Sequence, residues 1–260
     1  MVPDEAVRYL SWVPLMKHVE VSVVMPAFNA ARFIGEQIES ILAQDYQDFE
    51  LLIGDDRSGD DTIRIVRGYA DSPRVRIVEN EEHLGAGATR NRLNRLARGK
   101  YLTPCDADDL MLPGNLSRLH AYLEQRPETG MAYASFLMLE ADGEDRLERP
   151  PWIRGKHHHE SWDFVEFVAN HAGSMMRRDL VMDVGGYDEG IPILDSVSLT
   201  LKLAEVARLE WLEGEALYAY RRHPWSSSVR HPDWYPTFQK LVAEAMERRS
   251  TQQTAGPQSS

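Results

Sequence analysis

Short apolar runs alternate with longer segments of helical periodicity in the first half of the chain. Continuous apolar runs of this length are typical of strands buried on both faces of a parallel sheet. The segments between them carry apolar residues three or four positions apart, the spacing of an amphipathic helix. Strands are expected at 21–26, 49–54, 74–80 and 101–105, and helices at 29–44, 62–69 and 85–99. This alternation predicts right-handed βαβ units and an α/β fold with a mainly parallel central sheet.

The pattern becomes mixed after Pro113. The polar stretch 141–162 is rich in Pro and Gly and is expected to form a loop or hairpin over the sheet edge. A helix is expected at 115–125, and strands are expected at 130–140, 172–178, 208–213 and 216–222. Two residue types mark helix ends: Asn29 is the predicted N-cap of the first helix, and Gly99 is the predicted stop of the third.

These elements predict a single domain over residues 19–240, with a Rossmann-like half at 19–113 and a mixed half at 114–240. Residues 1–18 have apolar positions at helical spacing and are expected to form a helical extension. Packing on its own domain is the favoured role of this extension, and a dimer or peripheral membrane contact is the alternative. Residues 250–260 are polar and are predicted to be a disordered tail.

Charge and cysteine content narrow the function classes. The chain of 260 residues has 41 acidic and 29 basic residues and a formal net charge of −12. That balance argues against a nucleic-acid partner, because binding to phosphates needs clustered Lys and Arg. The single cysteine, Cys105, excludes a disulfide within one chain and favours a reducing, cytoplasmic location. No apolar stretch approaches the roughly 20 residues of a transmembrane helix.

Polar side chains follow the predicted strands at the points where the strands end. They are Asn29, Asp55–Asp56, Asn80 and Asp106–Asp109. Because ligands of parallel α/β sheets bind beyond the carboxyl ends of the strands, we expect these side chains to converge on one crevice.

The acidic stretch after the fourth strand is the first candidate for chemistry. Asp106 and Asp108 are two residues apart, so on extended backbone both carboxylates point the same way and can share a hard cation. Mg²⁺ and Mn²⁺ prefer such oxygen ligands, together with the phosphates of a substrate. The alternatives are a solvated loop or a helix N-terminus that accommodates negative charge.

Two further stretches are candidates for a nucleotide-binding site. Asp55 and Asp56 can accept hydrogen bonds from a base or ribose, whereas Asp60 can cap the helix that follows. "HLGAGATRNRLN" is neither a Walker loop nor a G-x-G-x-x-G motif. Gly85 is placed to open a helix toward anionic phosphates, which Arg90 can also reach. The alternative for Arg90 is an exposed charge on a helix.

Three stretches, "VSVVMPAFNAARFIGEQIESILAQDYQDFELLIGDDRSGDDT", "NEEHLGAGATRNRLNRLARGKYLTPCDADD" and "MRRDLVMDVGGYDE", occur in this order. Together they resemble family 2 glycosyltransferases of the GT-A fold over about residues 19–225. The resemblance implies transfer from a nucleotide diphosphate sugar with inversion, and Mn²⁺ or Mg²⁺ as cofactor. The implied nucleotide-sugar contacts are Pro26, Ala27, Phe28, Asn29, Asp55, Asp56, Gly85, Arg90, Asp106 and Ala107. The implied metal ligands are Asp108, Asp106 and His223.

The chain departs from the family pattern at the base. Family members usually carry Glu-Asp beyond the "GGYDE" type of segment, and the Asp is the base. Alignment through "LTLKLAE" places Asp195 at the Glu position and Ser196 at the base position. Asp195 is the candidate catalytic base if the backbone shifts by one residue, and the N-cap of the following helix otherwise. His171 and acids of 140–160 are further candidates, and "KHHHE" at 156–160 is interpreted as an acceptor-side loop.

The sequence therefore predicts a cytoplasmic, metal-dependent inverting glycosyltransferase with a nucleotide-sugar donor, UDP-linked by family resemblance. The alternative is a catalytically impaired relative or partner subunit that binds the nucleotide sugar without the usual base. A sugar nucleotidyltransferase is disfavoured, because "VVMPAFNAARF" lacks the basic, Gly-rich loop that handles a triphosphate. The acceptor stays unidentified among saccharides, lipid-linked sugars, peptides and small molecules.

Overall fold

The computed structural model describes residues 19–139, 146–148, 172–191, 193–226, 230 and 234–254. Within these residues the main sheet has seven strands in the order β10-β6-β9-β4-β1-β2-β3. All neighbouring pairs are parallel except those made by β9. The strands are β1 (Val21–Ala27), β2 (Phe49–Asp55), β3 (Val75–Glu79), β4 (Tyr101–Pro104), β6 (Thr129–Ala134), β9 (Met175–Arg177) and β10 (Arg208–Leu212). The predicted α/β class with a mainly parallel sheet is confirmed.

A second, smaller sheet lies beside the main sheet, and it contains part of a segment that was predicted to be a single strand. It consists of β5 (Leu110–Met111), β11 (Tyr218–Arg221), β7 (Phe136–Leu139) and β8 (Arg146–Glu148). The single strand expected at 130–140 is wrong, because the chain leaves the main sheet after β6 and enters the small sheet as β7. The change occurs at buried Ser135, whose carbonyl accepts a hydrogen bond from Leu217 of the segment before β11.

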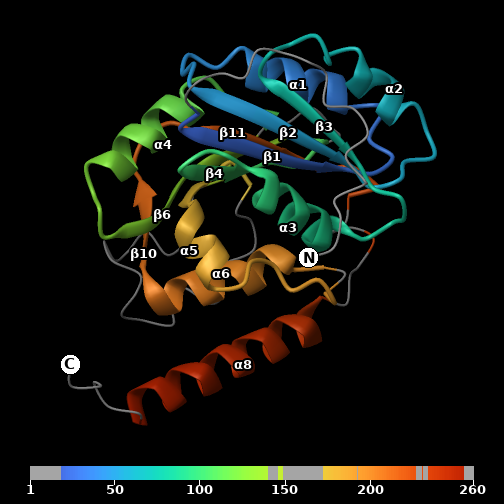
Figure 1. Ribbon diagram of the computed structural model, residues 1–260. Coiled ribbons are helices and arrows are strands. Elements are labelled where there is room, and N and C mark those ends of the chain that lie inside the picture. Colours follow the sequence, from blue (N-terminus) through green and yellow to red (C-terminus); the bar gives the residue numbers. More distant parts are fainter. Residues whose placement is uncertain are drawn as a thin grey trace, which may run out of the picture.

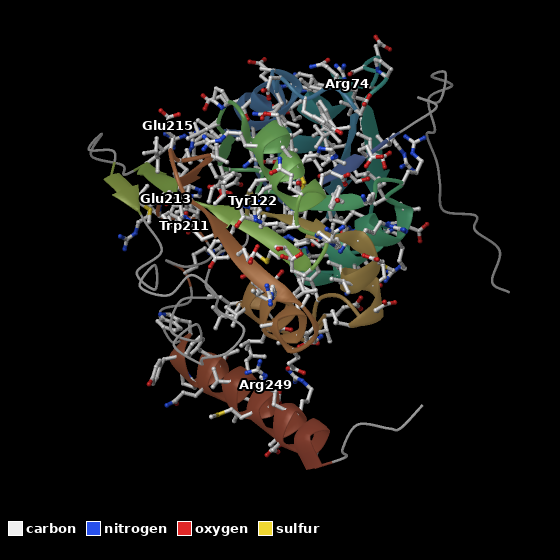
Figure 2. The ribbon with its side chains drawn as sticks, turned by 90° about the vertical axis from the view of Figure 1, so that its left-hand side faces the viewer. Arg74, Tyr122, Trp211, Glu213, Glu215 and Arg249 are labelled. Carbon is white, nitrogen blue, oxygen red and sulfur yellow. The ribbon has the colours of Figure 1, made fainter. Side chains whose placement is uncertain are left out.

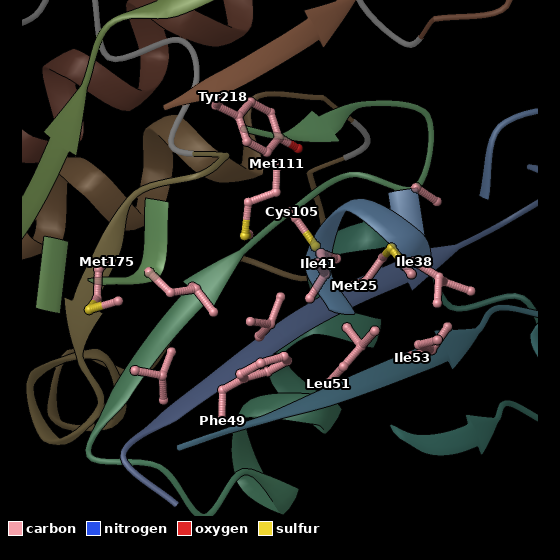
Figure 3. Packing of buried hydrophobic residues seen from close by; sticks show 14 of the residues in the cluster. Met25, Ile38, Ile41, Phe49, Leu51, Ile53, Cys105, Met111, Met175 and Tyr218 are labelled. Atoms are coloured by element: carbon pink, nitrogen blue, oxygen red, sulfur yellow. The ribbon is translucent and has the colours of Figure 1, made fainter. Parts of the chain in front are cut away.

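Helices cover both faces of the main sheet (Figure 1). One face packs against α1 (Ile34–Leu42), α2 (Thr62–Arg67) and α4 (Asn115–Glu124). The other packs against α3 (Ala86–Leu96), α5 (Arg178–Asp183) and α6 (Asp195–Val206). In the core under the first face, Tyr218 of β11 lies beside Met111 and Cys105 (Figure 3).

The last helix, α8 (Tyr235–Thr254), packs outside α6. In the view of Figure 2, Arg249 projects from α8, and its guanidinium donates to the carbonyl of Ala204 on α6. The prediction of a disordered tail from residue 250 is therefore wrong for its first part, since α8 continues to Thr254. Residues 255–260 and the predicted helical extension at 1–18 lie outside the described residues.

Two predicted helix ends are also corrected. Asn29 is not the N-cap of α1, which begins five residues later after Phe33. Asn29 instead has a left-handed φ of 51°, a conformation that Asn tolerates better than most residues. Gly99 does not end α3, which stops at Leu96. A Cβ atom on Gly99 would lie 2.6 Å from the backbone nitrogen of Ser22, so the glycine permits close approach to β1.

Candidate functional site

The carboxyl ends of β2 and β3 and the start of α3 meet at Asp56. Its Oδ1 accepts hydrogen bonds from the Leu84 amide and the Asn80 side chain, both at 2.8 Å. Its Oδ2 accepts from the Gly85 amide at 2.8 Å and lies 3.0 Å from His83 Nδ1. Burial opposes ionisation of Asp56, but the hydrogen bonds from Leu84, Asn80 and Gly85 outweigh it and lower the pKa. Asp56 therefore fixes the loop that leads into α3.

Asp55 precedes Asp56 and accepts fewer hydrogen bonds. Its Oδ2 accepts from the Ser58 amide at 3.1 Å, whereas its buried Oδ1 has no hydrogen-bond partner in the part of the chain that the structure describes. Asn29 faces the same turn, because its amide donates to the Ser58 hydroxyl and its Oδ1 accepts from the Gly59 amide. Asp60 was the predicted cap of α2, but the N-cap is Asp61. Asp60 still contacts the start of this helix, because its Oδ1 accepts from the Thr62 amide at 3.0 Å. Asp55 and Asp60 thus have separate contacts.

Two aromatic rings stand open beside Asp56. Phe28, at the end of β1, is 46% exposed, which is unusual for a large apolar side chain. Its ring centroid lies 4.2 Å from that of His83. The sequence analysis named Phe28 but missed His83, because the two residues are 55 positions apart and only the fold brings them together. An exposed ring pair of this kind can stack against a planar ligand.

Arg90 joins the two halves of the chain. This buried side chain projects from α3, and its guanidinium binds Asp106 after β4 and Asp195 on α6. Its Nη1 lies 2.5 Å from Asp195 Oδ2. Burial lowers the pKa of Arg90, but Asp195 and Asp106 raise it by more, so the guanidinium stays charged. The alternative of an exposed helix charge is therefore wrong for Arg90.

Asp195 lies in the first turn of α6, whose N-cap is Leu194. Its side chain makes no capping hydrogen bond, so the N-cap interpretation is wrong. One carboxylate oxygen binds Arg90, and the other has no hydrogen-bond partner among the described residues. Ser196, at the usual base position, is 8% exposed. Asp188 holds this helix start in place through Lys202 and the Ser198 hydroxyl.

The acidic stretch after β4 is a turn and not an extended segment, as the Asp109 amide donates to the Asp106 carbonyl. The extended backbone expected for Asp106 and Asp108 is therefore wrong, and the three carboxylates of the turn bind different partners. Asp106 binds Arg90, whereas Asp108 Oδ2 lies 2.9 Å from Nε2 of His223. Asp109 is fully buried, and its Oδ1 accepts from the Arg221 amide at 2.8 Å.

Burial dominates the charge state of this turn. It raises the pKa of Asp109 well above the ordinary value, and neighbouring Asp108 and Asp106 act in the same direction. It also raises the pKa of Asp106, although the Arg90 guanidinium lowers it. Tyr218 lies under the turn, and its hydroxyl accepts a hydrogen bond from the Asp106 amide at 3.0 Å. Sequence reasoning missed Tyr218, which looks like an ordinary strand residue.

The remaining predicted residues also lie at or near the carboxyl ends of the strands. Gly85 precedes α3 with a φ of 90°, and the space where a Cβ would point is open. Ala27 and Ala107 have buried side chains that pack in the core, and Pro26 lies within β1. His171 and residues 156–160, the other sequence candidates, lie outside the described residues.

The donor atoms around Asp108 fit a divalent cation. Asp108 and His223 present a carboxylate oxygen and an imidazole nitrogen within 2.9 Å, and both atoms suit Mn²⁺ better than a monovalent ion. The His223 ring is held in place by stacking on Phe33, with centroids 4.8 Å apart. Asp106 stands apart from this pair, since Arg90 engages it. The pair therefore suits a site in which a ligand supplies further oxygens.

The family model for Glycosyl transferase family 2 matches residues 22–185. The chain belongs to this family. Family 2 glycosyltransferases are enzymes that transfer glycosyl groups, and the matched range contains the strand ends around Asp56, Arg90 and the acidic turn. His223 and Asp195 lie beyond it. Among the described residues no helix is long and apolar enough to cross a membrane.

Curated relatives match parts of the chain. A putative glycosyltransferase EpsE of Bacillus subtilis is 39% identical over 41% of this chain and 39% of its own length. An uncharacterized glycosyltransferase MJ1057 of Methanocaldococcus jannaschii is 31% identical over 65% of this chain and 59% of its own length. The chain thus aligns with about two fifths to three fifths of these relatives.

Solved structures share the GT-A fold. Staphylococcus aureus TarS in complex with UDP-GlcNAc has a TM-score of 0.74 and 20% identity, covering 87% of this chain and 66% of that one. The mannosyltransferase PcManGT of Pyrobaculum calidifontis, in complex with GDP-Man and Mn²⁺, has a TM-score of 0.68 and 20% identity. That match covers 88% of this chain and 65% of PcManGT. At this identity the likeness establishes the fold alone.

Proposed function

We propose that this chain is a metal-dependent inverting glycosyltransferase that moves a sugar from a nucleotide diphosphate sugar to a hydroxyl acceptor. The observation that carries the proposal is the Arg90 bridge. It joins an acid of the turn that follows β4 to an acid of α6, and so brings a nucleotide-side carboxylate and a candidate base to one place.

The proposed nucleotide contacts follow from the geometry of the strand ends. The open rings of Phe28 and His83 would stack against the base, and the unpartnered Asp55 Oδ1 would accept a hydrogen bond from the nucleoside. Arg90 would orient Asp106 toward the ribose or diphosphate. A UDP-linked donor is supported by the printed names of two similar proteins, TarS with UDP-GlcNAc and Escherichia coli WfgD, a UDP-Glc-dependent glucosyltransferase.

Asp108 and His223 would hold Mn²⁺ or Mg²⁺. When bound, the ion supplies a Lewis acid that neutralises charge on the leaving diphosphate. The acceptor oxygen forms a bond to the anomeric carbon while the bond from that carbon to the diphosphate oxygen breaks, which inverts the centre. The second oxygen of Asp195 would take the acceptor proton as general base. Arg90 keeps the other oxygen of Asp195 oriented.

The test compares donor binding with turnover. Wild type, Asp108→Asn, Asp195→Asn and the exposed control Asp61→Asn are each screened with UDP-, GDP- and dTDP-sugars, with and without Mn²⁺. We expect a donor to raise the melting temperature only when Mn²⁺ is present, since ligands that bind the folded form stabilise it. Asp108→Asn should remove that shift. Asp195→Asn should keep it but lower donor hydrolysis or transfer by about 100-fold or more.

The second candidate is a nucleotide-sugar-binding relative or partner subunit without turnover. It is favoured by the neutral, nearly buried Ser196 at the usual base position and by the engagement of Asp195 with Arg90. Metal-dependent donor binding without hydrolysis or transfer in wild type would select this candidate. Turnover that is unchanged in Asp195→Asn would remove Asp195 as the base. A cytoplasmic location stays a prediction from the single cysteine.

A further inference from the structure

A second group of potential ligands lies at the amino end of β1, opposite the carboxyl ends that carry the candidate site. Glu20 immediately precedes β1, and His120 and Glu124 project from α4. One ligand atom of each residue lies within 4.8 Å of the others. Among the residues that the structure describes, this is the one group of three His, Cys, Asp or Glu side chains that meets so closely.

The backbone explains why these side chains meet. His120 and Glu124 are four residues apart on a helix, so they share one face, one turn above the other. The His120 ring lies against Tyr46, with centroids 4.7 Å apart, and meets Tyr101 edge-on. In this packing, Nε2 lies 3.3 Å from the Tyr46 hydroxyl and 3.8 Å from Glu20 Oε2. The imidazole is thus oriented before any ligand arrives.

Glu124 already binds one cationic side chain at this place. Lys100 and the Tyr101 hydroxyl both contact Oε1 of Glu124, whereas its Oε2 has no hydrogen-bond partner among the described residues. Lys100 is about half exposed and can move away as a divalent ion enters.

We infer that Glu20, His120 and Glu124 form a binding site for one transition-metal ion of the Zn²⁺ class. One imidazole nitrogen and two carboxylate oxygens are ordinary zinc ligands at about 2.0–2.2 Å, and water or the Tyr46 hydroxyl completes a tetrahedron. Because β1 has seven residues, the site lies about 20 Å from the acidic turn. The ion therefore cross-links the start of β1 to α4 and takes no part in glycosyl transfer.

The experiment measures zinc stoichiometry and affinity with a competing chromophoric chelator. The full chain is used with His157, His158 and His159 changed to Gln and with Asp108→Asn, so that other candidate ligands do not contribute. We expect one Zn²⁺ per chain and a higher melting temperature with zinc. Adding Glu124→Gln should weaken binding at least tenfold, and His120→Gln should abolish it. The exposed α1 carboxylate provides the matched control, Glu39→Gln, which should change nothing.

Equal zinc affinity in the parent, Glu124→Gln and His120→Gln would overturn the inference, as would a parent that binds no zinc. Circular dichroism checks that His120→Gln folds. Glu124 is exposed, so Glu124→Gln keeps the test decisive if the histidine variant does not fold. No nucleotide sugar is used, so this result is independent of the proposed function.

Discussion

At the scale of single residues, Arg90 is the side chain on which the candidate site depends most. It is buried, and it separates two carboxylates that belong to distant parts of the chain. Removing one member of a buried ion pair leaves an uncompensated charge, which is far more costly than losing an exposed pair. The position therefore has a structural role that can be measured without knowing the substrate.

Arg90→Met should lower the free energy of unfolding at pH 7 by about 3–5 kcal/mol, because Asp106 and Asp195 are left without their cation. The matched control is Arg64→Met on α2, whose guanidinium pairs with Asp61 in solvent. This substitution should leave the free energy of unfolding nearly unchanged, because exposed ion pairs contribute little. Urea denaturation of both variants provides the comparison. Equal small effects would mean that Arg90 does not hold the two acids together.

Sequence motifs singled out Asp56, Arg90 and His223, and the structure shows their contacts with Gly85, Asp106 and Asp108. Their roles toward a ligand stay predictions. Asn29 was placed correctly at the strand end but given the wrong role, because an asparagine suits both an N-cap and a left-handed turn. His83 and Tyr218 were missed, since their importance comes from contacts with Phe28 and Asp106 that only the tertiary fold creates.

At the scale of elements, alternating apolar runs predicted the order of β1 to β4 and of the helices between them. The same pattern failed at 130–140, because an unbroken apolar stretch does not reveal that the chain changes sheets at Ser135. The sequence also does not show how side chains are oriented within a turn. It therefore did not predict that Asp106, Asp108 and Asp109 bind different partners.

Gly173, just before β9, supports the acidic turn from below. It has a φ of 72°, and a Cβ atom there would lie 2.7 Å from the Tyr218 Cβ atom. Gly173→Ala should therefore displace Tyr218 from the Asp106 amide and lower the free energy of unfolding by about 2–3 kcal/mol. Gly190→Ala is the control, as no atom of the described residues beyond its chain neighbours lies within 4 Å of the added methyl group. Thermal unfolding of both variants tests this, and two equal shifts would contradict it.

Glu50 ties several elements together at the other end of β2. Its carboxylate accepts hydrogen bonds from Ser22 on β1, Arg76 on β3 and Arg98 after α3. Burial opposes ionisation, but the hydrogen bonds from Arg98, Arg76 and Ser22 outweigh it and lower the pKa of Glu50. The folded protein therefore binds this proton less tightly than the unfolded chain does.

Glu50→Gln should lower the free energy of unfolding by about 2–4 kcal/mol at pH 7, because charged hydrogen bonds are lost. The contribution of Glu50 is fully present above the ordinary pKa of about 4.3 and is lost as the pH falls through the lowered folded value. The difference between wild type and variant should therefore shrink below about pH 4 in urea titrations. A difference that stays constant down to pH 3 would refute the linkage, and Glu82→Gln, at an exposed site, serves as control.

At the scale of the whole molecule, the two faces of the sheet contribute different residues to the candidate site. The face under α1 and α4 holds the acidic turn through Met111 and Tyr218, and the other face carries α3 and α6 with Arg90 and Asp195. The candidate site lies where residues from both sides meet. Sequence patterns predicted the first half of this arrangement, but the contact between α3 and α6 spans about 100 residues and had no local signal.

The packing of α8 on α6 connects the C-terminal helix to the element that carries Asp195. Leu241 is 4% exposed in the core cluster of that face, whereas Met246 on the same helix is 51% exposed. Leu241→Ala should lower the free energy of unfolding by about 2–4 kcal/mol, because it leaves a cavity against α6, and Met246→Ala should change it by about 0.5 kcal/mol or less. Chemical denaturation of both variants is followed by circular dichroism, which reports helix, and by tryptophan fluorescence. If α8 is an integral part of the domain, the two signals of Leu241→Ala shift together; a helix signal that shifts alone would mean that α8 unfolds separately from the sheet.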